Sequence, residues 1–136
     1  VGWEICIRDS RHISQMAYTR VTSTKSPWLA GTQAGDMFAV PISHGEGRFV
    51  ADEATLRRLA ENGQIATQYV DPDGHVATDM PFNPNGSVWA VEGITSPDGR
   101  VLGKMGHCER KGENLYKNVP FNKDMQIFES GVKYFK

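Results

Sequence analysis

Apolar and polar residues alternate along this chain mostly over short runs, which is the pattern of β-strands. Residues 15–23 are rich in β-branched and aromatic side chains and partly alternate, so they predict a strand. Residues 37–42 form a short apolar run typical of a buried strand, and a further short strand is expected at residues 48–50. Residues 64–70 predict another strand, which ends at the turn-forming sequence Asp-Pro-Asp-Gly of residues 71–74.

The second half of the chain predicts a β-hairpin. Residues 80–87 carry two prolines and a glycine within eight positions, so this segment is expected to be irregular. Residues 88–94 then read as a strand, the sequence Ser-Pro-Asp-Gly of residues 96–99 as a tight turn, and residues 100–105 as a second strand. Two strands joined by so short a turn are expected to pair with each other.

Two segments predict helices. Asp52 is a typical N-cap residue, and it precedes a helix expected at residues 53–61 that stops at Asn62-Gly63. Asn122 is expected to cap a final helix at residues 123–136. The apolar residues of that final segment form a stripe at helical spacing. The stripe consists of Met125, Ile127, Phe128, Val132 and Phe135.

Composition and charge fit one domain covering residues 1–136, with 39% apolar and 23% charged residues. A net charge of −1, from 15 basic and 16 acidic residues, argues against nucleic acid as a partner. No apolar run is long enough to cross a bilayer, so we expect no membrane contact and a cytoplasmic location. Two cysteines, Cys6 and Cys108, cannot form a disulfide framework, and Cys6 is interpreted as buried strand filler.

The candidate chemistry lies at the end of the last predicted strand. His107 and Glu109 are two positions apart, and an extended chain directs such residues to the same side. A carboxylate that accepts the imidazole N–H sets the tautomer and favours the protonated ring, as a general base requires. Cys108 points away from this pair in an extended segment, so we interpret it as a small packed thiol rather than a nucleophile.

Two other interpretations of these residues remain open. A second His-x-Glu pair, His44 and Glu46, could join His107 and Glu109 in a site for zinc, manganese or iron within a small β-rich barrel. Elemental analysis of the purified protein distinguishes this metal-binding alternative. The third interpretation is a binding module that keeps the site geometry without turnover.

Three motifs follow one another in an order and spacing that point to a known family. They are Pro-Ile-Ser-His-Gly-Glu-Gly-Arg-Phe at residues 41–49, Asn-Pro-Asn-Gly-Ser at 83–87 and Gly-His-Cys-Glu-Arg at 106–110. Gly35-Asp36 and Ser26-Pro27-Trp28-Leu29 also fit. The chain resembles the glutaminase domain of phosphoribosylformylglycinamidine synthase, a class I glutamine amidotransferase of purine biosynthesis, and metal ligation is not part of that resemblance.

The resemblance implies an α/β fold, the C-terminal half of a flavodoxin-like amidotransferase domain with a mixed sheet, β-hairpins and two main helices. It also implies a triad in which a cysteine attacks the side-chain amide of glutamine, His107 shuttles the proton and Glu109 orients the histidine. The family's cysteine stands in a Gly-x-Cys-x-Gly turn, and this sequence contains no such turn. We therefore interpret the chain as the C-terminal part of that domain and expect it to be inactive by itself.

The resemblance also implies partners and cofactors. Glutamine is the expected substrate, and its ammonia would serve the ATP-dependent conversion of formylglycinamide ribonucleotide to formylglycinamidine ribonucleotide. No cofactor is expected in this part, whereas ATP and Mg²⁺ belong to the synthetase portion. The expected partners are that synthetase portion and the nucleophile-bearing half, and a sheet edge left uncovered could drive self-association.

Four further residues are candidates for the same site. His44 and Glu46 lie in a glycine-rich loop that permits close approach to a ligand, and Asn83 and Asn85 lie in the proline-containing loop. Each pair has two interpretations. The residues either line the glutamine pocket or the synthetase contact, or they only hold their own loops in place by hydrogen bonds.

Overall fold

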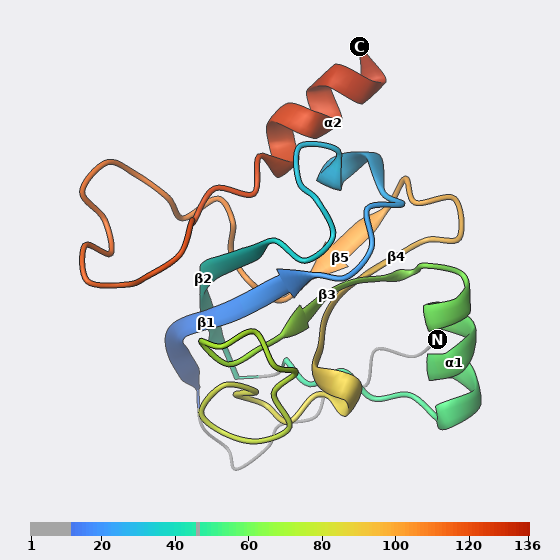
Figure 1. The fold of residues 1–136 in the computed structure, drawn as a ribbon, viewed down its shortest axis with the longest axis horizontal. Coiled ribbons are helices and arrows are strands. Elements are labelled where there is room, and N and C mark those ends of the chain that lie inside the picture. The colour runs from blue at the N-terminus through green and yellow to red at the C-terminus, as the bar shows by residue number, and fades with distance from the viewer. Residues whose placement is uncertain (1–11, 46) are drawn as a thin grey trace.

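The computed structural model describes residues 12–45 and 47–136, and these residues build one five-stranded sheet flanked by two helices (Figure 1). The strand order across the sheet is β2-β1-β3-β4-β5. Each strand pairing in the described residues is antiparallel, and an isolated parallel bridge joins Phe38 to Asn122. The strands are β1 (Ile13–Val21), β2 (Met37–His44), β3 (Ile65–Tyr69), β4 (Val91–Thr95) and β5 (Leu102–Lys104).

The helices lie in different places around the sheet: α1 is at the right of Figure 1, and α2 stands at the top beside the first 3-10 turn. The helical segments of the described residues are η1 (Pro27–Leu29), α1 (Glu53–Glu61), η2 (Val88–Ala90) and α2 (Ile127–Phe135). The expected α/β architecture with hairpins and two main helices is confirmed, but the sheet, expected to be mixed, has antiparallel strand pairings throughout the described residues.

Helix α1 forms where the sequence predicts it. The Asp52 side chain accepts a hydrogen bond from the Thr55 N–H at 2.8 Å, which satisfies one of the free donors of the first turn. Gly63 has φ +67° directly after the helix, a conformation that glycine adopts without steric cost. Leu56 and Leu59 are buried against the sheet, so local capping and tertiary packing favour the same helix.

The predicted hairpin of β4 and β5 is also confirmed, but β4 begins later than expected. Ser96 N–H donates to the Val101 carbonyl at 3.0 Å and closes the hairpin turn. Residues 88–90, expected as strand, instead form η2, in which Trp89 has φ 53° and Ala90 has φ 54°. The Trp89 carbonyl accepts a hydrogen bond from Gln68 on β3, so a contact outside the segment supports the non-extended backbone.

The short strand expected at residues 48–50 does not form. Phe49 is fully buried, and its N–H donates to the Ser87 hydroxyl at 3.0 Å while its carbonyl accepts from Val88 N–H. The residues around Phe49 therefore pair with another loop rather than with a sheet. The strand was predicted from the apolar character of Phe49. Apolar character alone does not distinguish a strand from a buried loop.

The final helix starts at Ile127 instead of residue 123. Asn122 accepts from Asp124 N–H at 3.0 Å, and Asp124 in turn accepts from Gln126 N–H at 2.9 Å, so these side chains form successive turns rather than a helix cap. Gln126 then has φ 53°, which is incompatible with a continuous helix from residue 123. The N-cap expected at Asn122 is therefore wrong.

The core consists of three apolar clusters. One lies between the sheet and α2, one around Tyr69 and Ile42, and one between α1 and strands β3 and β4. The first cluster includes Val40 of β2 together with Met125 and Ile127, and Cys108 packs against it. The end of β5 and the residues that follow it are thus anchored on a packed core, which is where the candidate site lies.

Candidate functional site

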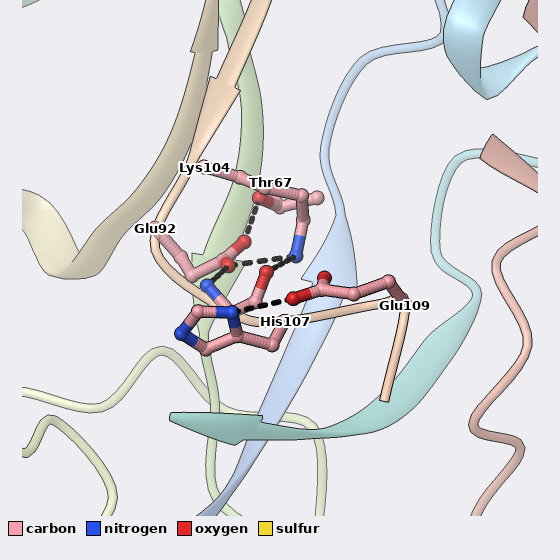
Figure 2. A network of polar contacts seen from close by, with 6 residues as sticks. Thr67, Glu92, Lys104, His107 and Glu109 are labelled. Atoms are coloured by element: carbon pink, nitrogen blue, oxygen red, sulfur yellow. Dashed lines mark hydrogen bonds and ion pairs between the residues drawn. The ribbon is translucent and has the colours of Figure 1, made fainter. Parts of the chain in front are cut away.

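His107 and Glu109 contact each other directly after β5. The His107 Nδ1 and Glu109 Oε1 atoms are 2.7 Å apart, within hydrogen-bonding distance (Figure 2). The backbone N–H of His107 donates to the Pro41 carbonyl of β2 at 2.9 Å, and this bond ties the backbone at the pair to the sheet. Both side chains are reachable from solvent, since 31% of His107 and 53% of Glu109 is exposed.

The charge state of Glu109 sets the tautomer of the imidazole. A hydrogen bond to the carboxylate from its own backbone N–H, and then the one with His107, hold the pKa of Glu109 below its usual range, so the carboxylate is ionised at neutral pH. An ionised carboxylate only accepts hydrogen bonds, so Nδ1 carries the hydrogen and Nε2 is left as the basic nitrogen. The pair can therefore take up and release a proton at Nε2.

A hollow of about 430 Å³ lies beside this pair. Its wall combines the polar His107 and Glu109 with apolar side chains from η1, β5 and the start of α2, and it is large enough for a small molecule. Another hollow of about 470 Å³ lies in the loop of residues 111–124 and shares no lining residue with the pair. The apolar part of the wall beside the pair is formed by Trp28, Leu102, Met105, Cys108, Ile127 and Phe128.

Cys108 is partly buried and packs against the first core cluster, as the sequence predicted. Burial raises the pKa of the Cys108 thiol, and the nearby Lys104 only partly opposes this effect. The thiol is therefore protonated at neutral pH, whereas a nucleophile must be a thiolate. The interpretation of Cys6 as buried filler lies outside the described residues.

A buried ionic network behind the pair was not anticipated from the sequence. Glu92 of β4 accepts hydrogen bonds from Lys104 Nζ at 2.8 Å and from Gly106 N–H at 2.6 Å, and it also contacts the Thr67 hydroxyl (Figure 2). Burial raises the pKa of Glu92, but the Lys104 ammonium and these hydrogen bonds outweigh it and keep the pKa below its usual range. The sequence feature that could have indicated this network is one charged residue on each strand of the hairpin, Glu92 and Lys104.

His44, expected in a loop, is the last residue of β2 and pairs with the second asparagine. Asn85 Nδ2 lies 3.1 Å from His44 Nδ1, and 4% of Asn85 is exposed. The ring of His44 occupies the space where a side chain on Gly47 would lie, since a Cβ there would be 2.2 Å from His44 Cε1. The backbone at Gly47 therefore lies close against the imidazole of His44. Glu46 lies outside the described residues.

Asn83 is fully committed to its own loop. Its side-chain amide donates to the Ala77 and Ser87 carbonyls at 3.2 and 3.0 Å, and its carbonyl oxygen accepts from Ser87 N–H. Of the described candidates, His44, Asn83 and Asn85 do not line the hollow beside His107.

The metal-binding alternative is not favoured. Among the described residues, the group whose ligand atoms converge is Asp71, Asp73 and His75, and it includes neither His44 nor His107. Asp71 in that group already accepts from two backbone N–H groups of its own turn, as an ordinary Asx turn does. Within residues 12–45 and 47–136, no helix is both long and apolar enough to span a membrane.

An α/β fold with a His–Glu pair beyond its last strand corresponds to a known class of proteins. The sequence pattern of the CobB/CobQ-like glutamine amidotransferase domain family matches residues 7–135, and the chain belongs to this family. It is similar to the phosphoribosylformylglycinamidine synthase subunit PurQ of Synechocystis sp., with 42% identity over 110 residues that cover 81% of this chain and 48% of the relative. The subunit PurQ of Aquifex aeolicus is 36% identical over 105 residues, covering 77% and 45% of the two chains.

A solved structure has the same fold. A chain in the structure of PurLQS from Thermotoga maritima superposes with a TM-score of 0.69 at 24% identity, covering 97% of this chain and 52% of that one. At this identity the likeness concerns the fold. The chain spans about half the length of the curated relatives it matches.

Proposed function

We propose that this chain is the His–Glu-bearing part of the glutaminase of phosphoribosylformylglycinamidine synthase. The glutaminase hydrolyses glutamine and supplies ammonia for the ATP-dependent conversion of formylglycinamide ribonucleotide to formylglycinamidine ribonucleotide. The observation that carries the proposal is the 2.7 Å contact between His107 Nδ1 and Glu109 Oε1 beside an open hollow. Its occurrence in a chain 42% identical to a subunit PurQ supports the substrate assignment.

His107 acts as the proton shuttle in this proposal, and Glu109 holds its tautomer. A cysteine thiolate attacks the amide carbon of glutamine, and the proton carried by His107 leaves with ammonia. Water then hydrolyses the thioester, with the imidazole taking the proton of the attacking water. The cysteine belongs to the part of the relatives that this chain does not span, because neither Cys6 nor Cys108 stands in a Gly-x-Cys-x-Gly turn.

The proposed partners follow from the assignment of the cysteine and of the His–Glu pair to different parts of the enzyme. The nucleophile-bearing half must lie against the hollow, and the synthetase portion, which would bind ATP and Mg²⁺, must receive the ammonia. No cofactor is proposed for this part itself, and its expected location is the cytoplasm. The similarity in fold to a chain of the PurLQS structure supports assembly with further subunits or domains.

The loop residues are proposed to hold their own loops in place rather than to bind glutamine. Asn83 uses its amide within its own loop, and Asn85 contacts His44. These contacts support a positioning role for His44, Asn83 and Asn85. We extend the same proposal to Glu46, the other member of the His44–Glu46 pair.

The test is substitution of His107 by Ala in the full-length protein. Glutamine-dependent synthesis is expected to fall by at least about 10²-fold, the usual contribution of a proton shuttle. Ammonia-dependent synthesis should remain, because added ammonia bypasses glutamine hydrolysis. His75→Ala is the matched control, since this histidine is 79% exposed and outside the hollow.

Normal use of glutamine by the His107→Ala protein would contradict the assignment. The isolated chain offers an independent check, because it should release no ammonia from glutamine above the buffer background. Labelling of Cys108 by a glutamine-mimicking electrophile, at a rate that depends on His107, would show instead that the chain contains its own nucleophile.

A further inference from the structure

A buried ion pair lies directly behind the proposed proton shuttle. The side chain of Glu92 is 0% exposed and that of Lys104 is 8% exposed, and they come from the two strands of the β4–β5 hairpin. Figure 2 shows both side chains converging on the backbone that leads into His107. Removing two charges from water is costly, and well-packed apolar residues often replace such pairs without loss of stability. The pair therefore calls for an explanation beyond packing.

Both ends of this pair contact the same residue, Gly106. Its N–H donates to Glu92 Oε1 at 2.6 Å, and its carbonyl accepts from Lys104 Nζ at 3.3 Å. The contact leaves no room for a side chain, because a Cβ on Gly106 would lie 2.5 Å from Val40 Cγ2 and 2.9 Å from Glu92 Oε1. The following N–H, of His107, is held by the Pro41 carbonyl. The backbone on both sides of Gly106 is thus held by hydrogen bonds.

We propose that Glu92 and Lys104 are positioning residues for His107: they hold the Gly106 backbone in the one direction from which the imidazole reaches Glu109. The proposal rests on the proposed function of His107 as proton shuttle. The thiolate and the basic nitrogen of such a site must be aligned closely, and a misplacement of about 1 Å can cost 10²-fold in rate. Apolar residues at the two positions would fill the space but leave the Gly106 N–H without an acceptor.

The test compares two double variants of the full-length protein. Glu92→Gln with Lys104→Met removes both charges but keeps an amide oxygen that can accept the Gly106 N–H. Glu92→Leu with Lys104→Met removes the charges and the acceptor together. Both variants avoid leaving one buried charge unpaired, which would unfold the protein for an unrelated reason. The difference between them reports the hydrogen bonds accepted at position 92, from the Gly106 N–H and from the Thr67 hydroxyl.

The Leu-containing variant is expected to lose on the order of 10²-fold in kcat for glutamine, with the KM for glutamine unchanged. Its ammonia-dependent rate should equal that of the parent, and the Gln-containing variant should recover most of the glutamine kcat. An equal fall of the glutamine-dependent and ammonia-dependent rates would show a merely structural role. Parental glutamine kcat in the Leu-containing variant would also overturn the proposal.

Hydrogen exchange supplies a readout that does not depend on activity. In the Leu-containing variant the amides of Gly106 and His107 should exchange faster than in the parent, while those of α1 should not change. Unchanged exchange at Gly106 would overturn the proposal. If His107→Ala left glutamine use intact, the proposed function would fail, and the exchange of these two amides would still decide whether Glu92 and Lys104 hold the backbone.

Discussion

His107, Cys108 and Glu109 are consecutive residues that all line the open hollow. The first and third contact each other, whereas the thiol between them also packs against the first core cluster. These residues lie in a turn beyond β5, in which the Arg110 N–H donates to the His107 carbonyl at 3.3 Å, so a turn rather than the alternation of an extended chain brings the imidazole and the carboxylate together. The identity of the basic nitrogen, however, depends on the ionised state of Glu109, which its hydrogen bonds maintain.

At the scale of one residue, the burial of His44 leads to a prediction of how the free energy of unfolding depends on pH. Burial is the largest effect and lowers the pKa of His44 from its ordinary value of 6.5, against the opposing effects of its own backbone and of the Glu92 carboxylate. The unfolded chain therefore binds a proton at His44 more readily than the folded protein does. The free energy of unfolding should decrease as the pH falls below about 6.5, and it should level off below the pKa of the folded state.

The measurement is urea unfolding at several pH values between about 7.5 and 5. Replacing His44 by Gln should flatten the pH dependence in this range. His75→Gln is the control, because His75 is 79% exposed at its side chain. An equal pH dependence in the parent and in the His44→Gln protein would show that the burial of His44 does not disfavour its charged form.

At the scale of elements, α2 has one packed and one exposed face. Its inner face carries Ile127, Ser130 and Gly131, which are buried, and the Ser130 hydroxyl accepts from Gly31 N–H at 3.1 Å. The remaining apolar side chains of the helix face solvent, at 58%, 60% and 56% exposure. The stripe expected from the sequence is therefore divided between the core and the surface. The exposed members are Phe128, Val132 and Phe135.

Gly131→Ala tests how tightly α2 is packed against η1. A Cβ at this position would lie 2.1 Å from Trp28 Cζ3, and Trp28 is held by a 2.7 Å hydrogen bond from its Nε1 to the Arg100 carbonyl. Overpacking of this kind costs about 1–3 kcal/mol, more than the roughly 1 kcal/mol by which Ala is favoured over Gly in a helix. The variant should therefore be less stable.

Thermal or urea unfolding measures this effect. Lys133→Ala on the exposed side of α2 is the control, because it removes a 3.4 Å ion pair with Glu129 that is exposed and worth at most about 1 kcal/mol. A Gly131→Ala protein more stable than the parent would show that the helix moves away from Trp28 without cost.

At the scale of the whole molecule, the sequence led us to expect an uncovered sheet edge. The outer edge of β2, however, is partly covered. The Ala39 N–H donates to the Asn122 carbonyl at 2.9 Å, and the Pro41 carbonyl accepts from His107 N–H. Two segments from the second half of the chain thus occupy part of this edge. The exposed apolar surface lies instead on α2 and beside the hollow, and apolar patches of this kind mark contact surfaces.

We therefore expect the isolated chain to associate through this apolar surface. The partner is either the nucleophile-bearing half, which would restore glutaminase activity, or a second copy of the chain. Native mass spectrometry or sedimentation should show a heterocomplex or a dimer, and Phe128→Ser with Val132→Ser should weaken it because the buried apolar area falls. A stable, monodisperse monomer would rule this expectation out.

Local patterns predicted those features whose causes are local. The helix at residues 53–61 has its cap, its glycine stop and its buried leucines within twelve positions, and the hairpin turn at residues 96–99 carries its own polar contacts. The contact of His107 with Glu109 was also expected, but it forms in a turn and not in the extended chain from which it was expected. The catalytic roles and the loop candidates stay predictions, which the variants above test.

Other predictions failed where a distant partner decided the outcome. Asn122 has the side chain of a helix cap, but Ala39 bonds to its carbonyl and its side chain forms a separate turn. Phe49 is as apolar as a strand residue, but its backbone pairs with Ser87 and Val88, which lie about forty positions further along. The backbone can satisfy its hydrogen bonds in several ways, and tertiary contacts select among them.

The sequence by itself determined the family of this chain, its strand-rich character and the position of the His–Glu pair, because motifs, alternation and spacing are properties of neighbouring residues. Only the tertiary structure decided that Glu92 and Lys104 meet behind that pair, since their contact depends on the pairing of β4 with β5. Their charges are stable in the interior only because Thr67, Gly106 and each other complete their hydrogen bonds, and such completion exists only in the folded chain.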